Sequence, residues 1–138
     1  MLAKKAQEEV DAAMAVVVQI RQNIEHLQSR RQQLLDMYAD YKRRIEDKQQ
    51  QWHSMADTAN HRQFMSHLLQ LVDRIDLDLQ RAHNDLTQAR EAQQKADQQR
   101  VKMASLMEQD LHRVKVYQQK KDQKHMDALG ITLFNLKA

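Results

Sequence analysis

The chain of 138 residues is 41% hydrophobic and 30% charged, with one glycine, no proline, no cysteine and a formal net charge of +3. Folds with frequent tight turns are excluded, because such turns draw on Gly and Pro for their backbone angles. Without cysteine there can be no disulfide, thiol catalysis or thiolate metal site, which fits a reducing compartment. The abundance of Gln, Ala, Leu, Lys and Arg predicts long helices.

The first half of the chain carries the a/d pattern of a coiled coil. Apolar or small residues recur at alternating steps of four and three, and only Arg31 and Lys48 depart from that chemistry. The seam consists of Ala6, Val10, Ala13, Val17, Ile20, Ile24, Leu27, Arg31, Leu34, Tyr38, Tyr41, Ile45, Lys48, Trp52 and Met55. It predicts a first helix over about residues 2–55.

A cluster of capping residues and poor helix formers follows, formed by Ser54, Asp57, Thr58 and Asn60. We expect a bend over about residues 56–60, although the phase of the seam also permits one uninterrupted helix. A bend near 58–60 places residues whose numbers sum to about 118–120 opposite each other, with large side chains facing small ones. Tyr38 would then meet Ala82, Arg31 would meet Ala89, and Ile24 would meet Ala96.

A second seam predicts a second helix over about residues 61–129. Its members are Met65, Leu68, Val72, Ile75, Leu79, Ala82, Leu86, Ala89, Gln93, Ala96, Arg100, Met103, Met107, Asp110, Val114 and Tyr117. This helix extends beyond the first and is followed by a tail, residues 130–138, that starts at the only glycine. The predicted fold is all-α: one domain, residues 1–138, folded as an antiparallel two-helix coiled-coil hairpin with a longer second helix.

The sequence offers little for catalysis. No two of the seven histidines are four residues apart, so the HExxH zinc arrangement does not occur, and a single glycine cannot build a phosphate-binding loop. We expect no enzymatic activity, no cofactor and no metal.

The basic residues near position 120 lack the interleaved aromatic residues of a single-strand binder, so we expect no nucleic acid. No apolar run spans a bilayer and no signal peptide is recognisable, which predicts a cytoplasmic protein.

Several apolar residues near the bend lie off the seam, namely Leu35, Met37, Phe64, Leu69 and Leu71. Either they pack around the hairpin tip or they form a docking patch for another protein. A similar off-seam strip, Met14, Val16 and Val18, lies near the free ends.

Four segments stand out in order along the chain: residues 6–13, which include Glu9, Val10 and Asp11, Leu34 to Tyr41, Phe64-Met-Ser-His-Leu68, and Asp122-Gln-Lys-His-Met-Asp127. Together they resemble the FliJ family, the coiled-coil component of the flagellar type III export ATPase complex. The resemblance spans about residues 2–129, and the apolar tail from Gly130 departs from it.

The resemblance implies a stalk and adaptor whose free ends insert into the hexameric ring of the export ATPase and promote its assembly and activity. It also implies that the tip contacts the cytoplasmic domain of the export gate protein FlhA, that empty export chaperones bind, and that the protein is peripheral at the inner face of the cell membrane. By position, the gate-binding residues would be Leu34, Met37, Tyr41, Phe64, Leu68, Leu71 and Ile75. We assign Lys120, Lys121, Lys124, Met14 and Val18 to the ATPase ring.

Two alternatives stay open at this point. One is the equivalent stalk of a virulence type III secretion system. The other is a free-standing structural coiled coil, in which one long helix dimerises in parallel through both seams.

Overall fold

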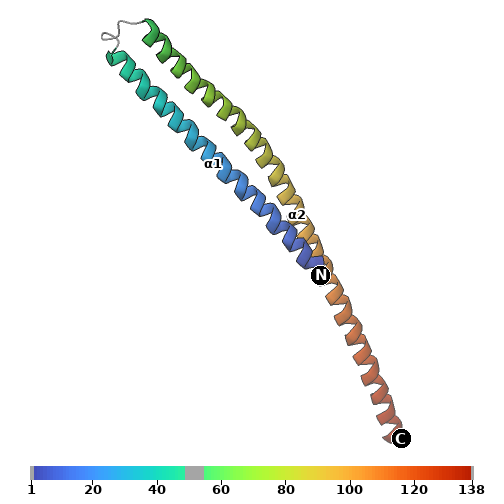
Figure 1. Ribbon diagram of the computed structural model, residues 1–138. Helices are drawn as coiled ribbons and strands as arrows, with labels where there is room; N and C mark the ends of the chain where they lie inside the picture. Colours follow the sequence, from blue (N-terminus) through green and yellow to red (C-terminus); the bar gives the residue numbers. More distant parts are fainter. Residues whose placement is uncertain (1, 49–54, 138) are drawn as a thin grey trace. The chain divides into compact units, whose positions relative to one another are not determined.

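The computed structural model describes residues 2–48 and 55–137, and all of them are helical. Helix α1 runs over Leu2–Lys48 and helix α2 over Met55–Lys137 (Figure 1). The second helix, with 83 residues against 47, is the longer one, as the sequence predicts. Trp52 of the seam and Ser54 of the expected bend lie outside the described residues.

Contacts between Cα atoms group the chain into two compact units. We call Asp11–Gln94 the hairpin unit, and Met1–Val10 together with Lys95–Ala138 the end unit. Both helices contribute to each unit. That the whole chain is one domain therefore stays a prediction.

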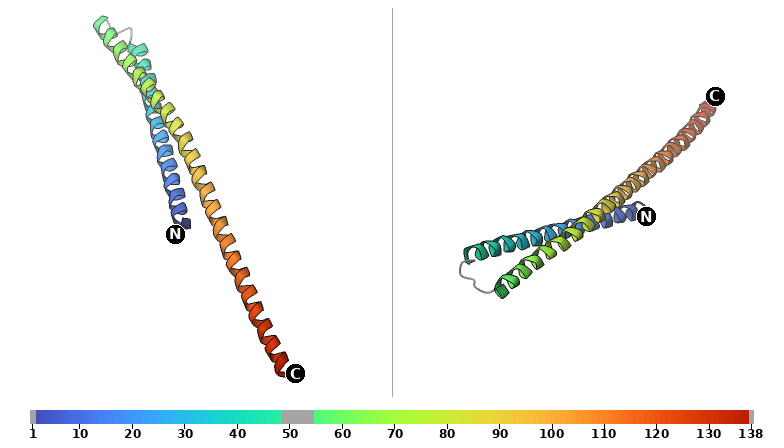
Figure 2. Two further views of the ribbon diagram at one scale, coloured as in Figure 1. Left: turned by 90° about the vertical axis from the view of Figure 1, so that its right-hand side faces the viewer. Right: turned by 90° about the horizontal axis from the view of Figure 1, so that it is seen from above.

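In the hairpin unit α1 and α2 lie side by side and run in opposite directions (Figures 1 and 2). Their shared core joins Val17 and Ile24 of α1 to Ala82, Leu86 and Ala89 of α2, each at most 8% exposed. Burying the side chain of a Val, Ile or Leu stabilises a fold by about 1.5–3 kcal/mol. This packing confirms the predicted all-α antiparallel hairpin and contradicts the alternative of one uninterrupted helix.

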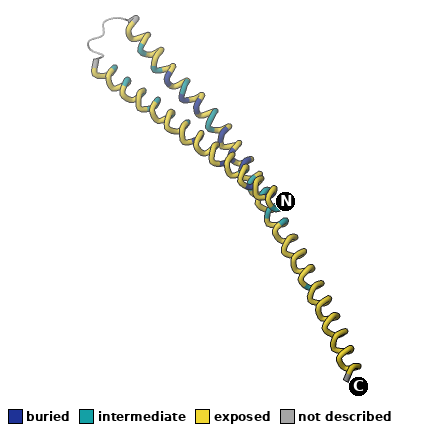
Figure 3. The backbone as a smooth tube through the Cα atoms, turned by 60° about the horizontal axis from the view of Figure 1, so that its bottom comes forward, coloured by how far each residue is buried: buried dark blue, intermediate teal, exposed yellow. Residues whose placement is uncertain are grey.

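The heptad seam, and not composition alone, selects the buried face. Every α1 seam residue from Ala13 to Ile45 is buried or half-buried, and so is every α2 seam residue from Met65 to Gln93. The neighbours Val17 and Val18 illustrate the selection, with 4% and 51% of their surface exposed. Figure 3 shows the buried and half-buried residues recurring along the paired helices.

The predicted register within this unit is wrong. Arg31 pairs with Asp76, about two heptads before the expected Ala89, and the core cluster places Ile24, not Tyr38, with Ala82. A shift by whole heptads brings a and d positions back to a and d positions. The seam is therefore satisfied in both registers, and matching large with small residues did not separate them.

The predicted bend at 56–60 is wrong. Asp57, Thr58 and Asn60 lie in the first turns of α2, which begins at Met55. Helix α1 is described as far as Lys48, and the remaining residues of the expected first helix, up to 54, lie outside the described residues. An acidic residue such as Asp57 is favourable in a first turn, where it meets the positive end of the helix dipole. Poor helix formers cost only about 0.7 kcal/mol each, less than the packing that follows them contributes.

In the end unit the small residues Ala6 and Val10 of α1 are buried, and Ala96, Arg100 and Met103 of α2 are half-buried. Beyond Met103 every described side chain of α2 except Val116 is exposed.

The predicted end of the second helix at 129 is wrong, because α2 continues through Gly130 to Lys137. Gly130 has no positive φ, and a Cβ placed there would meet nothing within 4 Å. A glycine inside a helix costs only about 1 kcal/mol relative to alanine, so it does not end a helix by itself.

Candidate partner-binding surfaces

Three rings from both helices cluster in the hairpin unit. The hydroxyl of Tyr41 on α1 is hydrogen-bonded to Nδ1 of His61 on α2. The Tyr41 ring centroid lies 5.2 Å from that of His61 and 4.7 Å from that of Phe64, with tilted planes in both cases. Tilted pairs at these separations are favourable for aromatic rings. Tyr41 therefore holds the two α2 side chains against α1.

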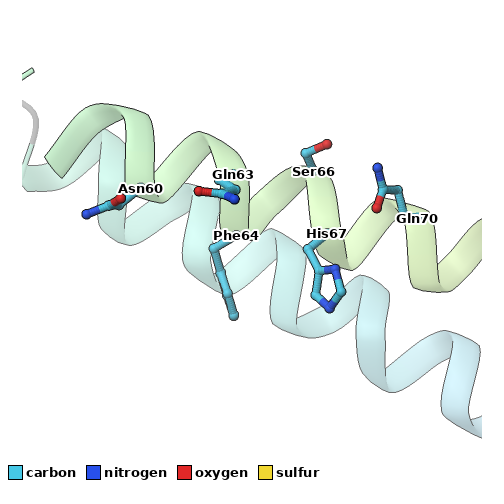
Figure 4. Close-up of a pocket in the computed structure, with 6 residues that line it drawn as sticks. All are labelled: Asn60, Gln63, Phe64, Ser66, His67 and Gln70. Atoms are coloured by element: carbon cyan, nitrogen blue, oxygen red, sulfur yellow. The ribbon is translucent and has the colours of Figure 1, made fainter. Parts of the chain in front are cut away.

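Phe64 combines this anchoring with access to solvent. It is 41% exposed, and it lines a surface pocket on α2 with Asn60, Gln63, Ser66, His67 and Gln70. Phe64 and His67 project from one edge of α2, whereas Ser66 points the other way (Figure 4). Off-seam Met37 on α1 is also half exposed, at 50%. A fixed, exposed aromatic ring beside polar amides is the kind of anchor that protein interfaces use.

The structure divides the seven residues expected at the export gate. Leu68 and Ile75 are 3% and 7% exposed, so they pack between the helices and cannot directly contact a partner in this conformation. Leu34, Tyr41 and Leu71 are half-buried. Met37 and Phe64 alone are open to a partner, and we call these two residues the tip patch.

The residues expected at the ATPase ring are all exposed, but they belong to different units. Met14 and Val18, at 47% and 51%, stand one turn apart on the outer face of α1 in the hairpin unit. Lys120, Lys121 and Lys124 are exposed on α2 in the end unit. The three lysines belong to a basic segment, residues 113–124, that also contains Arg113 and Lys115 and has one acidic residue, Asp122.

The end unit also exposes seam residues. Beyond Met103 the heptad continues through Met107, Val114 and Tyr117, which are 49%, 58% and 69% exposed, with the exposed Asp110 as the one charged seam position between them. Leu106 and Leu111 flank them at 46% and 68%. We call these five residues the bare seam. A coiled-coil seam that neither of the two described helices covers is a candidate binding face.

Among residues 2–48 and 55–137 no group of three or more His, Asp or Glu could hold a metal ion. In the same ranges, no helix is long and apolar enough to cross a membrane.

Sequence reasoning missed the ion pair between Arg31 Nε and Asp76 Oδ1, which are 2.6 Å apart. A basic residue on an apolar seam was a signal for an acidic partner on the other helix. Which acid it meets depends on the register, and the heptad leaves the register open.

A family model described as flagellar FliJ protein matches residues 1–138. No curated protein and no solved structure matches the chain.

Proposed function

The chain belongs to the flagellar FliJ protein family, which makes it a protein associated with flagellar type III export, and on that basis we propose that it is the stalk and adaptor of the export ATPase. In this proposal the end unit inserts into the hexameric ATPase ring, the tip patch contacts the cytoplasmic domain of the export gate protein FlhA, and empty export chaperones bind. The protein acts through contacts without catalysis of its own, in the cytoplasm at the inner face of the cell membrane.

The observation that carries the proposal is the bare seam. Most of the stability of a helix in a protein comes from the packing of its apolar face. The three seam residues Met107, Val114 and Tyr117 are each about half exposed or more. A ring whose inner wall is apolar would cover this face, as a second helix covers the seam of the hairpin unit.

Charge supports the same assignment of the end unit. Lys120, Lys121 and Lys124 follow directly after the bare seam and are exposed. An acidic ring entrance would attract them and speed association, an effect that salt weakens.

For the gate we propose the tip patch as the direct contact. The aromatic anchor is Phe64, which Tyr41 fixes from the other helix at a ring distance of 4.7 Å. A side chain that is already held in place loses little conformational freedom on binding. Leu68, one turn from Phe64 and 3% exposed, would support the patch from beneath without touching the gate.

The proposal is tested by binding the purified chain to the gate domain. We expect Phe64→Ala and Met37→Ala each to weaken binding about tenfold or more, the range of an interface anchor. The matched control is Leu77→Ala, because Leu77 is an exposed apolar residue of the same helix, at 58%, outside the tip patch. Equal affinity for the wild type and all three variants would refute the tip patch as the gate contact.

A further inference from the structure

The last turns of α2 differ in chemistry from the rest of the helix. Between Asp127 and Lys137 there is no charged residue. The apolar side chains there are exposed by 51–78%: Leu129, Ile131, Leu133, Phe134 and Leu136. Met126, one turn earlier, is 70% exposed. We call Met126 and these five residues the apolar end.

The apolar face is too wide for a single helical partner. A helix turns by about 100° per residue, so Met126 and the five residues cover about 220° of the circumference. A stripe of about 100° is what a helix needs to pack on one neighbour or in one groove. An apolar surface that extends over more than half of a helix fits an environment that surrounds the helix.

The polar groups on the remaining arc are few. They are Thr132 and Asn135, three residues apart and therefore on one face. The Thr132 hydroxyl donates a hydrogen bond to the Ala128 carbonyl oxygen at 2.9 Å, so its proton is already satisfied within the helix. Such back-bonding lowers the penalty of moving a hydroxyl out of water.

Basic residues precede the apolar end and align with it. Arg113, Lys120, Lys124 and Ile131 follow at intervals of seven, four and seven, which places them on one line along α2. All four are exposed. A row of cations next to an apolar end is complementary to an anionic headgroup layer above acyl chains.

We propose that the apolar end of α2 inserts into the interface of an anionic lipid bilayer while Arg113, Lys120 and Lys124 contact its headgroups. The segment from 129 to 137 is about 13 Å long, which suits immersion in the headgroup and acyl boundary and not a full span. This contact with lipid is direct and goes beyond the proposed stalk function. Because the same lysines are proposed to face the ATPase ring, lipid and ATPase would compete for them.

Vesicle sedimentation of the purified full chain, without any export protein, tests the proposal independently of the stalk function. The probes are vesicles of phosphatidylcholine alone and of phosphatidylcholine with about 30% phosphatidylglycerol. We expect the wild type to bind the anionic vesicles at least tenfold more strongly. Arg113→Gln, Lys120→Gln and Lys124→Gln together should weaken that binding about a hundredfold, since each charge near the surface is worth about fivefold.

The apolar contribution is tested by a matched pair of variants. Leu133→Glu should abolish sedimentation, whereas Leu77→Glu should not, although both leucines are 58% exposed. Neither position is packed in the core, and circular dichroism verifies that both variants remain helical.

Three results would overturn the proposal. The wild type could fail to bind anionic vesicles, it could bind neutral ones equally well, or the two glutamate variants could behave alike. The apolar end could instead pair with a second copy of the chain, which light scattering would show as a dimer that Leu133→Glu dissociates and vesicles leave unchanged.

Discussion

The guanidinium Nε of Arg31 on α1 lies 2.6 Å from the carboxylate Oδ1 of Asp76 on α2. Arg31 occupies a seam position where the heptad would otherwise place an apolar residue. A polar residue at such a position reduces stability but specifies the register of a coiled coil. We infer that this pair fixes which heptads of the hairpin unit face each other.

A double-mutant cycle measures the contribution of this pair. Because 39% and 46% of the two side chains are exposed, we expect Arg31→Ala and Asp76→Ala to show a coupling of about 0.2–1 kcal/mol in urea unfolding. The Arg31 variant alone should lose more than the Asp76 variant, since its aliphatic stem packs on the seam. A coupling of zero would show that the ion pair has no energetic part in the register.

The register can be determined by cross-linking. The chain has no cysteine, so an engineered pair forms without competition. We expect Ile24→Cys with Ala82→Cys to form a disulfide, because both residues belong to one core cluster and a disulfide requires Cα atoms within about 7 Å. Tyr38→Cys with Ala82→Cys should remain reduced, and its ready oxidation would contradict the register described above.

The sequence could predict the helices and their buried face, but it could not predict their register. The spacing of Val17, Ile24, Leu68 and Leu86 was sufficient for the helices and their buried face, because a period of 3.5 residues has one structural solution. It was not sufficient for the register, because a shift by whole heptads leaves the same residues buried.

The candidate gate-binding residues were likewise predictable only in part. Phe64 and Met37 could be selected as off-seam apolar residues, but the roles of Leu68 and Ile75 depend on burial, which the family resemblance alone does not report. The course of α2 through Gly130 depended on a balance of about 1 kcal/mol between a glycine and its helix-forming neighbours, too fine for a composition argument.

The same substitution at two adjacent valines, Val17 and Val18, tests which face of α1 is buried. Val17→Ala should lower the free energy of unfolding by about 1.5–2.5 kcal/mol, because two buried methyl groups are removed. Val18→Ala should change it by less than about 0.5 kcal/mol, since Val18 is 51% exposed. Chemical denaturation compares the two directly. Equal losses would mean that the seam does not form the core.

Hydrogen exchange tests whether the bare seam lacks a partner within the chain. We expect amides between Leu68 and Ala89 to exchange most slowly and those beyond Leu106 to exchange within the fastest helical class, because helix without packed side chains opens locally. Addition of the cognate export ATPase should slow exchange beyond Leu106. Strong protection there in the isolated chain would indicate that another part of the chain, or a second copy, covers the bare seam.

The measurement that tests the stalk assignment most directly is the ATP hydrolysis rate of the cognate export ATPase as this chain is added. We predict that the hydrolysis rate rises to a plateau. The variant carrying Lys120→Glu, Lys121→Glu and Lys124→Glu should need a concentration at least about tenfold higher than the wild type to reach half of the maximal increase. Leu77→Ala should match the wild type. No increase with the wild-type chain, or an identical increase with the charge-reversed variant, would contradict the proposed insertion of the end unit into the ring.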